Sequence, residues 1–270
     1  MLAYYGPEWE SLASRMVDRW CTSFSGNTGL QFPSTMGRNH GTLTNFANNG
    51  NDAYVASPDR LALNFDGAND HVNVGRNAAF QFDFSSRFSI SAWIKTTAST
   101  GSGIIGKRPV SAGWYFSIES SNVIGLVLQG TSSAIMVRSV ASGVSDGNWH
   151  HVAGTYNGNS NASGISLFVD GRQVSTNTIL NSAVGSLLNS GDTTIGSVTT
   201  NQFFLAAHLD DIILFSTNLT PNEIQFIYEQ GRGGGLLMQP PRRRSYFIAP
   251  VSGWKSYWIR PSSKLIGAGI

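Results

Sequence analysis

The chain has 270 residues, of which 41% are hydrophobic and only 13% charged, with 30 glycines and one cysteine. This apolar content is sufficient for a packed core and excludes a chain that is disordered throughout. Few charges and many glycines are typical of short strands joined by tight turns. The single cysteine, Cys21, excludes an intrachain disulfide, so the fold must depend on burial, with or without a bound metal.

Basic residues are concentrated at the C-terminal end of the chain. Residues 230–270 hold seven of the 18 lysines and arginines and no acidic residue, which leaves 11 basic against 16 acidic residues elsewhere. We therefore expect this end to have a role distinct from that of the acidic body. The N-terminus lacks the basic and apolar regions of a secretory signal peptide, and no stretch approaches the ~20 apolar residues of a membrane span. We expect a protein made in the cytoplasm with no membrane partner.

The predicted elements, in chain order, are mostly strands. A short helix is expected within residues 9–20, and loops with brief strands over residues 21–60. From residue 61 onward, apolar and polar residues alternate in short runs, as in half-buried strands. These runs are residues 61–67, 71–75, 87–95, 103–107, 113–120, 123–130, 148–156, 164–174, 193–197 and 205–215.

Two local signals define a hairpin and a late helix. Asp170-Gly171 favours a type I′ turn, which needs two positive φ angles. Thr220-Pro221 followed by Glu223 forms a capping box at a helix start, and Gly231 is expected to end that helix. We predict an all-β fold, a two-sheet antiparallel jelly-roll sandwich with one short late helix. The predicted parts are an N-terminal extension (1–20), the sandwich (21–232) and an extended C-terminal arm (233–270).

Several motifs in this order resemble the laminin-G-like, concanavalin A-like (pentraxin-like) family of jelly rolls. The motifs are HGTLTN (40–45), LALNFDGANDHVNVG (61–75), FSISAWIK (88–95), NWHHVAGTY (148–156), ISLFVDGRQV (165–174) and LDDIILFSTNLTPNEI (209–224). Together they cover roughly residues 20 to 232. One departure is Ala207, because the family often has glycine at this place.

The resemblance implies a structural calcium ion at Asp66 and Asp210. Carboxylates and backbone carbonyls at a glycine turn are the oxygen ligands that Ca²⁺ prefers. The alternative is that Asp66 forms an Asx turn and Asp210 accepts backbone N–H groups. Asp70 and Asp211 are weaker candidates.

Catalysis is not expected. Glycosidases of the laminarinase type on this fold carry an E-x-D-x-x-E pattern, which places carboxylates on one face of a strand. The five glutamates are Glu8, Glu10, Glu119, Glu223 and Glu229, and none stands in such a pattern. Neighbouring strand residues face opposite sides of a sheet, so His150 and His151 cannot share one metal and are expected to pack. No spacing links Cys21 to a histidine as a nucleophile.

Three tryptophans are candidates for a sugar-stacking platform: Trp93, Trp114 and Trp149. Aromatic faces bind the CH groups of sugars. The alternative, which is the commoner role of a single tryptophan, is that each ring fills the core or braces a sheet edge. Trp93 is the most interesting, because it shares its strand face with Ser89, Ser91 and Lys95.

The C-terminal arm interleaves basic and aromatic residues. We expect these residues to anchor a partner: Arg242, Arg243, Arg244, Tyr246, Phe247, Trp254, Tyr257 and Trp258. Three interpretations are a solvated end, a nucleic-acid binder and an arm that orders on a protein. The aromatic content favours the arm, docked on a neighbouring copy or another acidic protein surface, so a homo-oligomer is expected.

The resulting hypothesis is a phage virion protein, such as a capsid decoration, fibre or tail-associated component. The sandwich would be displayed for contact with glycans or a host surface, and the terminal segments would attach it. One alternative is a carbohydrate-binding adhesin at a bacterial cell surface. A second is a diverged glycoside hydrolase or lyase with carboxylates drawn from different strands.

Overall fold

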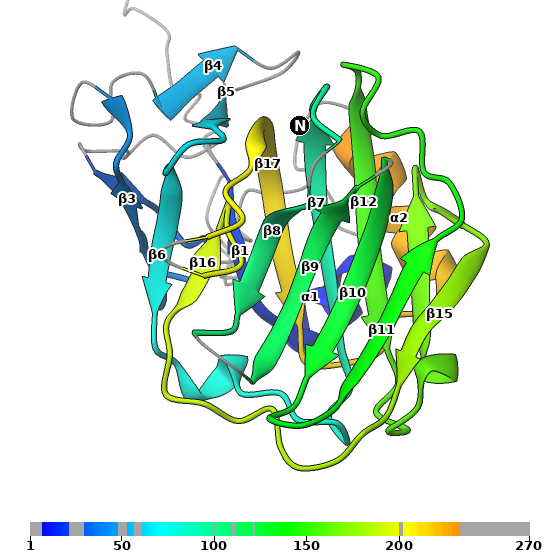
Figure 1. Cartoon of the computed structure of the whole chain (residues 1–270). Helices are drawn as coiled ribbons and strands as arrows, with labels where there is room; N and C mark the ends of the chain where they lie inside the picture. The colour runs from blue at the N-terminus through cyan, green and yellow to red at the C-terminus, as the bar shows by residue number, and fades with distance from the viewer. Residues whose placement is uncertain are drawn as a thin grey trace, which may run out of the picture. The chain divides into compact units, whose positions relative to one another are not determined.

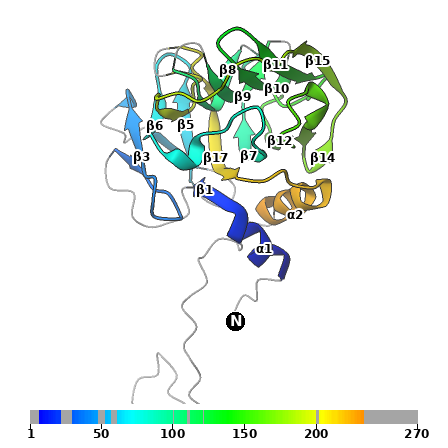
Figure 2. The same ribbon diagram turned by 90° about the horizontal axis from the view of Figure 1, so that it is seen from below.

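The computed structural model describes residues 7–21, 30–47, 53–56, 61–99, 101–109, 112–120, 122–199 and 202–232. All of them belong to one compact unit, residues 1–238. They form two antiparallel sheets packed face to face, with helices on the outside of one sheet (Figures 1 and 2). The predicted fold class is therefore confirmed, whereas the predicted arm lies outside the described residues.

The first sheet, sheet A, has eight strands. Their order is β14 (Arg172–Gln173), β13 (Ile165–Val169), β12 (Trp149–Tyr156), β7 (Phe88–Lys95), β17 (Ala206–Phe215), β5 (Leu61–Asp66) and β4 (Tyr54–Ala56), with β1 (Met16–Trp20) also paired to β17. The ten-residue β17 organises this sheet. It pairs with β7 on one side and, on the other, with β5 near its start and β1 near its end.

The second sheet, sheet B, has nine strands. Their order is β15 (Thr176–Asn181), β11 (Ala134–Ser139), β10 (Val123–Gln129), β9 (Gly113–Glu119), β8 (Ser102–Lys107), β16 (Thr193–Ile195), β6 (His71–Gly75), β3 (Gly41–Thr44) and β2 (Gln31–Phe32). Two short 3₁₀ helices, Ala78–Phe80 and Ala162–Gly164, lie in the connections. Strands β8 to β11 form the broad front of the molecule in Figure 1.

The main core fills the space between the two sheets. Alternation decides which side chains enter it, because successive strand residues face opposite sides. In β7 the inward residues are Phe88, Ile90, Ala92 and Ile94, all fully buried, as the sequence pattern predicts. Phe88 stacks on Phe82 with ring centroids 4.6 Å apart. This aromatic packing adds to the free energy gained from burying the aliphatic residues.

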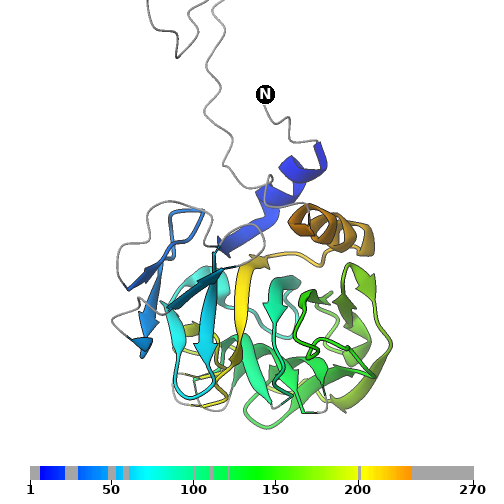
Figure 3. The same cartoon turned by 90° about the horizontal axis from the view of Figure 1, so that it is seen from above.

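A second core lies on the outside of sheet A, under helices α1 (Pro7–Arg15) and α2 (Pro221–Arg232). Its buried members are Trp9, Leu12, Ala153, Phe168, Ile213, Phe215, Leu219, Ile224 and Ile227. Figures 2 and 3 show both helices on the side of the sandwich that is opposite to sheet B. Sheet A is thus apolar on both faces, whereas an antiparallel sheet often leaves one face to solvent.

The sandwich begins earlier than the sequence predicted. Residues 16–20 were assigned to an extension and to a helix, but the helix ends at Arg15 and Met16–Trp20 form strand β1. This strand pairs with the end of β17 and buries Trp20 completely. It also buries Arg19, which forms an ion pair with Asp211. The pairing partner lies almost 200 residues away, so local patterning could not reveal it.

The predicted hairpin and helix cap are both present. Asp170 and Gly171 have φ angles of 49° and 75°, as a type I′ turn requires. The Glu223 amide donates to Thr220 Oγ1 over 3.3 Å, and Glu223 Oε2 accepts from the Thr220 amide over 2.7 Å. Gly231, expected to end the helix, lies within α2 instead. None of the helices in the described segments is both long and apolar enough to span a bilayer.

Candidate functional site

The outer face of sheet B carries a row of polar side chains next to an apolar row. Ser117, Gly125 and Arg138 lie opposite one another across β9, β10 and β11. Two residues further along each strand, and so on the same face, Tyr115 lies opposite Val127, which in turn lies opposite Met136. We call these residues, together with Glu119 and Arg108, the sheet B patch. No described helix or strand lies over β9, β10 and β11 in Figures 1 and 2. Within the patch, Arg108, Tyr115 and Arg138 are partly exposed, whereas the other members are buried: Ser117, Glu119, Gly125, Val127 and Met136.

Glu119 and Arg138 form the charged centre of this patch. Arg138 Nη2 donates to Glu119 Oε2 over 2.8 Å, and Ser117 Oγ donates to Glu119 Oε1 over 2.6 Å. Gly125 leaves the space that this pair occupies, because a Cβ there would lie 3.0 Å from Glu119 Cγ. The Arg138 side chain remains 32% exposed, which leaves guanidinium donors available to a ligand.

An aromatic ring borders the charged centre. The Arg108 guanidinium lies over the Tyr115 ring, 5.7 Å from its centroid, as in a cation–π contact. Burial and the nearby Glu119 carboxylate raise the pKa of Tyr115 above its usual value, so the phenol stays neutral. The opposing residue on β8 is Gly106, whose missing Cβ lets the Tyr115 side chain lie close to the strand.

The patch is suited to binding rather than to hydrolysis of a glycosidic bond. Its partly exposed groups are the guanidinium donors of Arg108 and Arg138 and the aromatic ring of Tyr115, beside the mostly buried Glu119 carboxylate. Hydrolysis by a glycosidase needs two carboxyl groups about 5 to 10 Å apart. Glu119 is the single acidic residue in the nine strands of sheet B.

The predicted tryptophan platform is not assembled. Trp114 belongs to the core between the sheets, is 1% exposed and donates to the Phe80 carbonyl over 3.0 Å. It faces inward because it alternates with Tyr115 on β9, so it cannot reach a sugar in solvent. Trp93 and Trp149 do lie on the outer face of sheet A, but there a helix and two histidines surround them.

Trp93 packs beneath the end of α2. Its ring stacks on Tyr228 with centroids 5.7 Å apart and lies 5.6 Å from His151. A Cβ on Gly231 would lie 2.2 Å from Trp93 Nε1, so this glycine allows the helix to approach the indole. Trp93 is only partly exposed and is not free to stack on a sugar as the platform hypothesis requires, since the helix lies where a ligand would lie.

Trp149 is the candidate tryptophan least enclosed by other elements. It is half-buried and lies opposite Lys95, which lies opposite His208 on β17. The ring centroids of Trp149 and His208 are 6.3 Å apart. Burial and the Lys95 ammonium lower the pKa of His208, which favours a neutral ring. Trp149 does not touch the sheet B patch, because it belongs to the opposite sheet.

The two adjacent histidines point to opposite faces of β12, as predicted. His151 is buried against Trp93 and Tyr228, and burial lowers its pKa to about 4. His150 lies at the rim, where its ring nitrogens contact Asp170 Oδ2 at 2.8 Å and Asp146 Oδ1 at 3.1 Å. Partial burial lowers the pKa of His150, but the two carboxylates raise it above its usual value. These contacts support packing rather than shared metal ligation.

The two carboxylates predicted to bind calcium do not converge. Asp66 lies opposite Ala206 on β17, whereas Asp210 lies four residues further along β17, roughly 13 Å away. Asp66 Oδ1 accepts from the Ala68 amide over 2.8 Å, which is the predicted Asx turn. Asp210 Oδ1 accepts from the Asp211 amide over 2.8 Å. Within the described ranges no three histidine, cysteine or acidic side chains are grouped to hold a metal.

The remaining candidates lie elsewhere. Cys21 is fully buried, which agrees with the expectation that it is not a nucleophile. All arm residues predicted to anchor a partner lie outside the described residues. Sequence reasoning missed the sheet B patch. Its signal was the alternation of Tyr115, Ser117 and Glu119 with buried aromatics and aliphatics along β9, which was read only as a strand.

The comparisons with known proteins agree with this two-sheet architecture. Residues 66–225, more than half of the chain, match the family described as the concanavalin A-like lectin/glucanases superfamily. The chain belongs to this family. A comparison with curated protein sequences finds no match.

Several solved structures share the fold at low sequence identity. The binding domain of Paraclostridial Mosquitocidal Protein 1 gives a TM-score of 0.60 at 15% identity, covering 82% of this chain and 53% of that one. The binding domain of botulinum neurotoxin serotype D gives 0.59 at 16% identity, covering 83% and 53%. Trypanosoma rangeli sialidase gives 0.56 at 16% identity, covering 83% and 34%. The chain thus spans about half of the toxin binding domains and a third of the sialidase.

Proposed function

We propose that this protein is a non-catalytic binding module that recognises a glycan, or a surface bearing one, through the sheet B patch. The observation that carries the proposal is the pairing of the partly exposed Tyr115 ring with the partly exposed Arg138 guanidinium and its Glu119 partner on the outer face of sheet B. A pyranose ring is apolar and polar in the matching way. Its CH groups pack on aromatic rings, and its hydroxyls form hydrogen bonds with charged groups.

The family and the solved structures support the class of ligand. The family description includes lectins, two of the structures are described as toxin binding domains, and the sialidase is described in complex with difluoro sugars. Those ligands belong to those proteins. For this chain the argument depends on Tyr115, Glu119 and Arg138.

The same face argues against glycosidase activity. Glu119 is held by Arg138 and Ser117, and no strand of sheet B supplies a second carboxylate opposite to it. Hydrolysis by a glycosidase needs a second carboxyl group on the other side of the glycosidic bond. We therefore keep the diverged hydrolase or lyase as the outcome that the experiment must exclude.

The proposal is tested with the full-length chain on a glycan array, followed by calorimetric titration with the glycans that bind. We expect Tyr115→Ala and Arg138→Met each to weaken binding at least tenfold, or about 1.4 kcal/mol. The matched control is Arg76→Met, which removes another surface arginine paired with an aspartate, at 3.3 Å from Asp192. It should change the affinity less than twofold.

Two results would contradict the proposal. Affinities that stay within twofold in both patch variants would place any glycan site elsewhere, with the row of Trp149, Lys95 and His208 as the next candidate. Release of shorter sugars during the titration, lost in Glu119→Gln, would instead establish the enzyme.

We propose a finer role as well, that of a phage virion component in which the sandwich is displayed and the arm attaches it to other copies or capsid proteins. The support is the contrast between seven basic residues without an acid in residues 230–270 and the acidic body. A carbohydrate-binding adhesin on a bacterial surface is the alternative, and it would use the same sheet B patch.

A further inference from the structure

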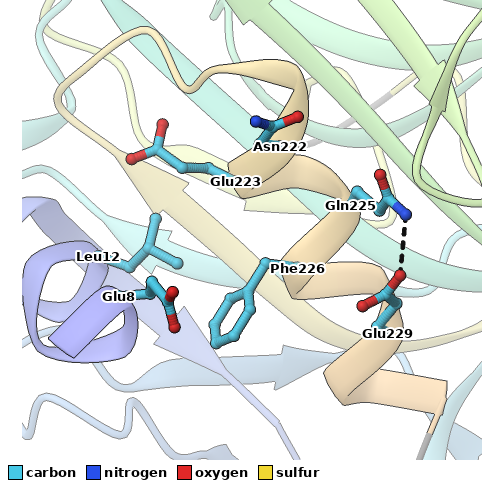
Figure 4. Close-up of a pocket in the computed structure, with 7 residues that line it drawn as sticks. All are labelled: Glu8, Leu12, Asn222, Glu223, Gln225, Phe226 and Glu229. Carbon is cyan, nitrogen blue, oxygen red and sulfur yellow. Dashed lines mark hydrogen bonds between the residues drawn. The ribbon is translucent and has the colours of Figure 1, made fainter. Parts of the chain in front are cut away.

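A groove runs between the two helices that cover sheet A. It has a volume of about 270 Å³ and is lined by Glu8, Leu12, Asn222, Glu223, Gln225, Phe226 and Glu229. Figure 4 shows Glu8 and Leu12 on α1 facing Phe226 and Glu223 on α2, with Glu229 one turn further along α2. The groove lies on the side of sheet A, opposite to the sheet B patch.

The rim of this groove is acidic. Arg15 on α1 forms an ion pair with Glu223, which ties the two helices together and neutralises one carboxylate. Glu229 accepts only from the uncharged Gln225 amide, over 2.9 Å. Among the described residues, no lysine or arginine pairs with Glu8 or Glu229. Two negative charges at the rim are therefore available to a cationic partner.

The floor of the groove is apolar. Leu12 is almost fully buried, and Phe226 packs against the same cluster while remaining partly exposed. Acidic edges around an apolar floor select a ligand with both positive charges and apolar side chains. A purely polar cation would leave the apolar surface of Phe226 in contact with water. A purely apolar ligand would remove water from the charged glutamates without replacing its hydrogen bonds.

One segment of this chain has that composition. Residues 240–248 read Pro-Pro-Arg-Arg-Arg-Ser-Tyr-Phe-Ile, with three positive charges followed by three large apolar side chains. We propose that, in the protein that is not attached to a partner, this segment docks in the groove between α1 and α2 of its own chain. The arginines would lie at Glu8 and Glu229, and Tyr246 or Phe247 would cover Phe226.

The chain is long enough for this intramolecular docking. Seven residues, 233–239, separate the end of α2 from the segment and can span roughly 25 Å when extended. The 12 residues of α2 extend over only about 18 Å. Three of the seven are Gly233, Gly234 and Gly235, which permit the chain to reverse direction. A short tether gives a millimolar effective concentration, which favours the chain's own segment over that of a neighbour.

The experiment is a cross-linking measurement on the full-length chain. Asn222→Cys at the groove is combined with Ser245→Cys in the segment, and a short bismaleimide joins the two thiols. The native Cys21 is fully buried and should not react. We expect an intramolecular product whose rate does not depend on protein concentration. A pair on the opposite sheet, Asn177→Cys with Ser245→Cys, should react at least tenfold more slowly.

A charge test separates docking from the mere proximity of a tether. Glu8→Lys with Glu229→Lys should lower the rate of the groove pair about tenfold, and Arg242→Glu, Arg243→Glu and Arg244→Glu added to that variant should restore it. Glu10→Lys is the matched control, because Glu10 is exposed on α1 but does not line the groove. Circular dichroism and the thermal midpoint should confirm that every variant is folded.

Each contrary result overturns the proposal. A rate unaffected by the charge reversal would mean that the segment does not occupy the groove. If the cross-linked product is mainly a dimer, and its rate of formation rises with protein concentration, the groove is occupied by the segment of another copy instead. This docking does not depend on glycan binding, since the groove and the sheet B patch lie on opposite sheets, so either proposal can fail alone.

Discussion

The two outer faces of the sandwich differ in what covers them. On sheet A, α1 and α2 bury Phe168, Phe215 and their neighbours in a second core. On sheet B, the strands expose Arg138 and Tyr115 with no described helix above them. The same strand alternation therefore yields a packed interface on one sheet and a ligand-accessible surface on the other.

This difference explains why tryptophans were poor guides to the site. Trp93 shares its strand face with polar residues, which made it a candidate for ligand binding. Helix α2, about 130 residues further along the chain, packs on that face, and its Tyr228 stacks on the Trp93 ring. Tyr115 alternates with core residues in the same manner and stays partly exposed, and no helix of the described residues lies over its strand. The character of a strand face is thus set by distant elements as much as by the strand itself.

The largest effect should separate the two faces by stability. Phe215→Ala removes a fully buried ring from the second core and should lower the free energy of unfolding by about 3–5 kcal/mol. Tyr115→Ala, on the open face, should cost about 1 kcal/mol. Urea unfolding measures both. Equal losses would show that the patch is structural and would remove its contrast with sheet A.

The pH dependence of stability should sharpen the comparison next. Burial on the covered face lowers the pKa of His151 to about 4. Between pH 6.5 and 4 this imidazole is therefore protonated in the unfolded chain and neutral in the folded chain. The free energy of unfolding should therefore fall as the pH drops through this range, by up to about 3 kcal/mol. His151→Gln should lose this slope when unfolding is measured at pH 7, 5.5 and 4.5.

His150 supplies the matched control at the rim. Its pKa is raised by Asp170 and Asp146, although partial burial opposes this, so it contributes stability below its unfolded pKa of about 6.5 that is lost as the pH rises. His150→Gln should change the slope in the opposite sense to His151→Gln. A wild-type slope in the His151 variant would mean that this ring is protonated in the fold.

The smallest effect concerns glycines on the two faces. Gly231→Ala places a Cβ 2.2 Å from Trp93 Nε1, so α2 must shift, and we expect a loss of about 1–2 kcal/mol despite the better helix propensity of alanine. Gly125→Ala meets the flexible Glu119 side chain at 3.0 Å and should change stability by less than about 0.5 kcal/mol. Thermal unfolding of Gly231→Ala with Trp93→Leu should show recovery if the clash is the cause.

Local chemistry was readable from the sequence, and long-range pairing was not. Asp170-Gly171 and the Thr220 capping box involve neighbours in the chain, so their residue types determine the backbone directly. The alternation of β7 also gave its inner face correctly. By contrast, β1 exists because Met16–Trp20 meets the end of β17.

The candidate site follows the same division. Strands β9 and β10 were predicted, but β11, which carries Arg138, was not. The neighbourhood of Glu119 and Arg138 also depends on the register of these three strands, which alternation alone does not fix. The two carboxylates expected to bind calcium lie apart for a related reason, because residues of one sheet need not lie at the same end of it. Asp66 and Asp210 lie on paired parts of the fold but at different heights along β17.

Because both helices lie beside sheet A, the ends of the described chain and the sheet B patch lie on opposite sides of the sandwich. Residue 7 begins α1 and residue 232 ends α2, and both helices lie opposite to sheet B (Figure 3). A chain tethered through the residues that follow α2 would point its patch away from the tether. Many copies fixed to one support would then present parallel patches, and weak individual contacts would add up to a strong multivalent attachment.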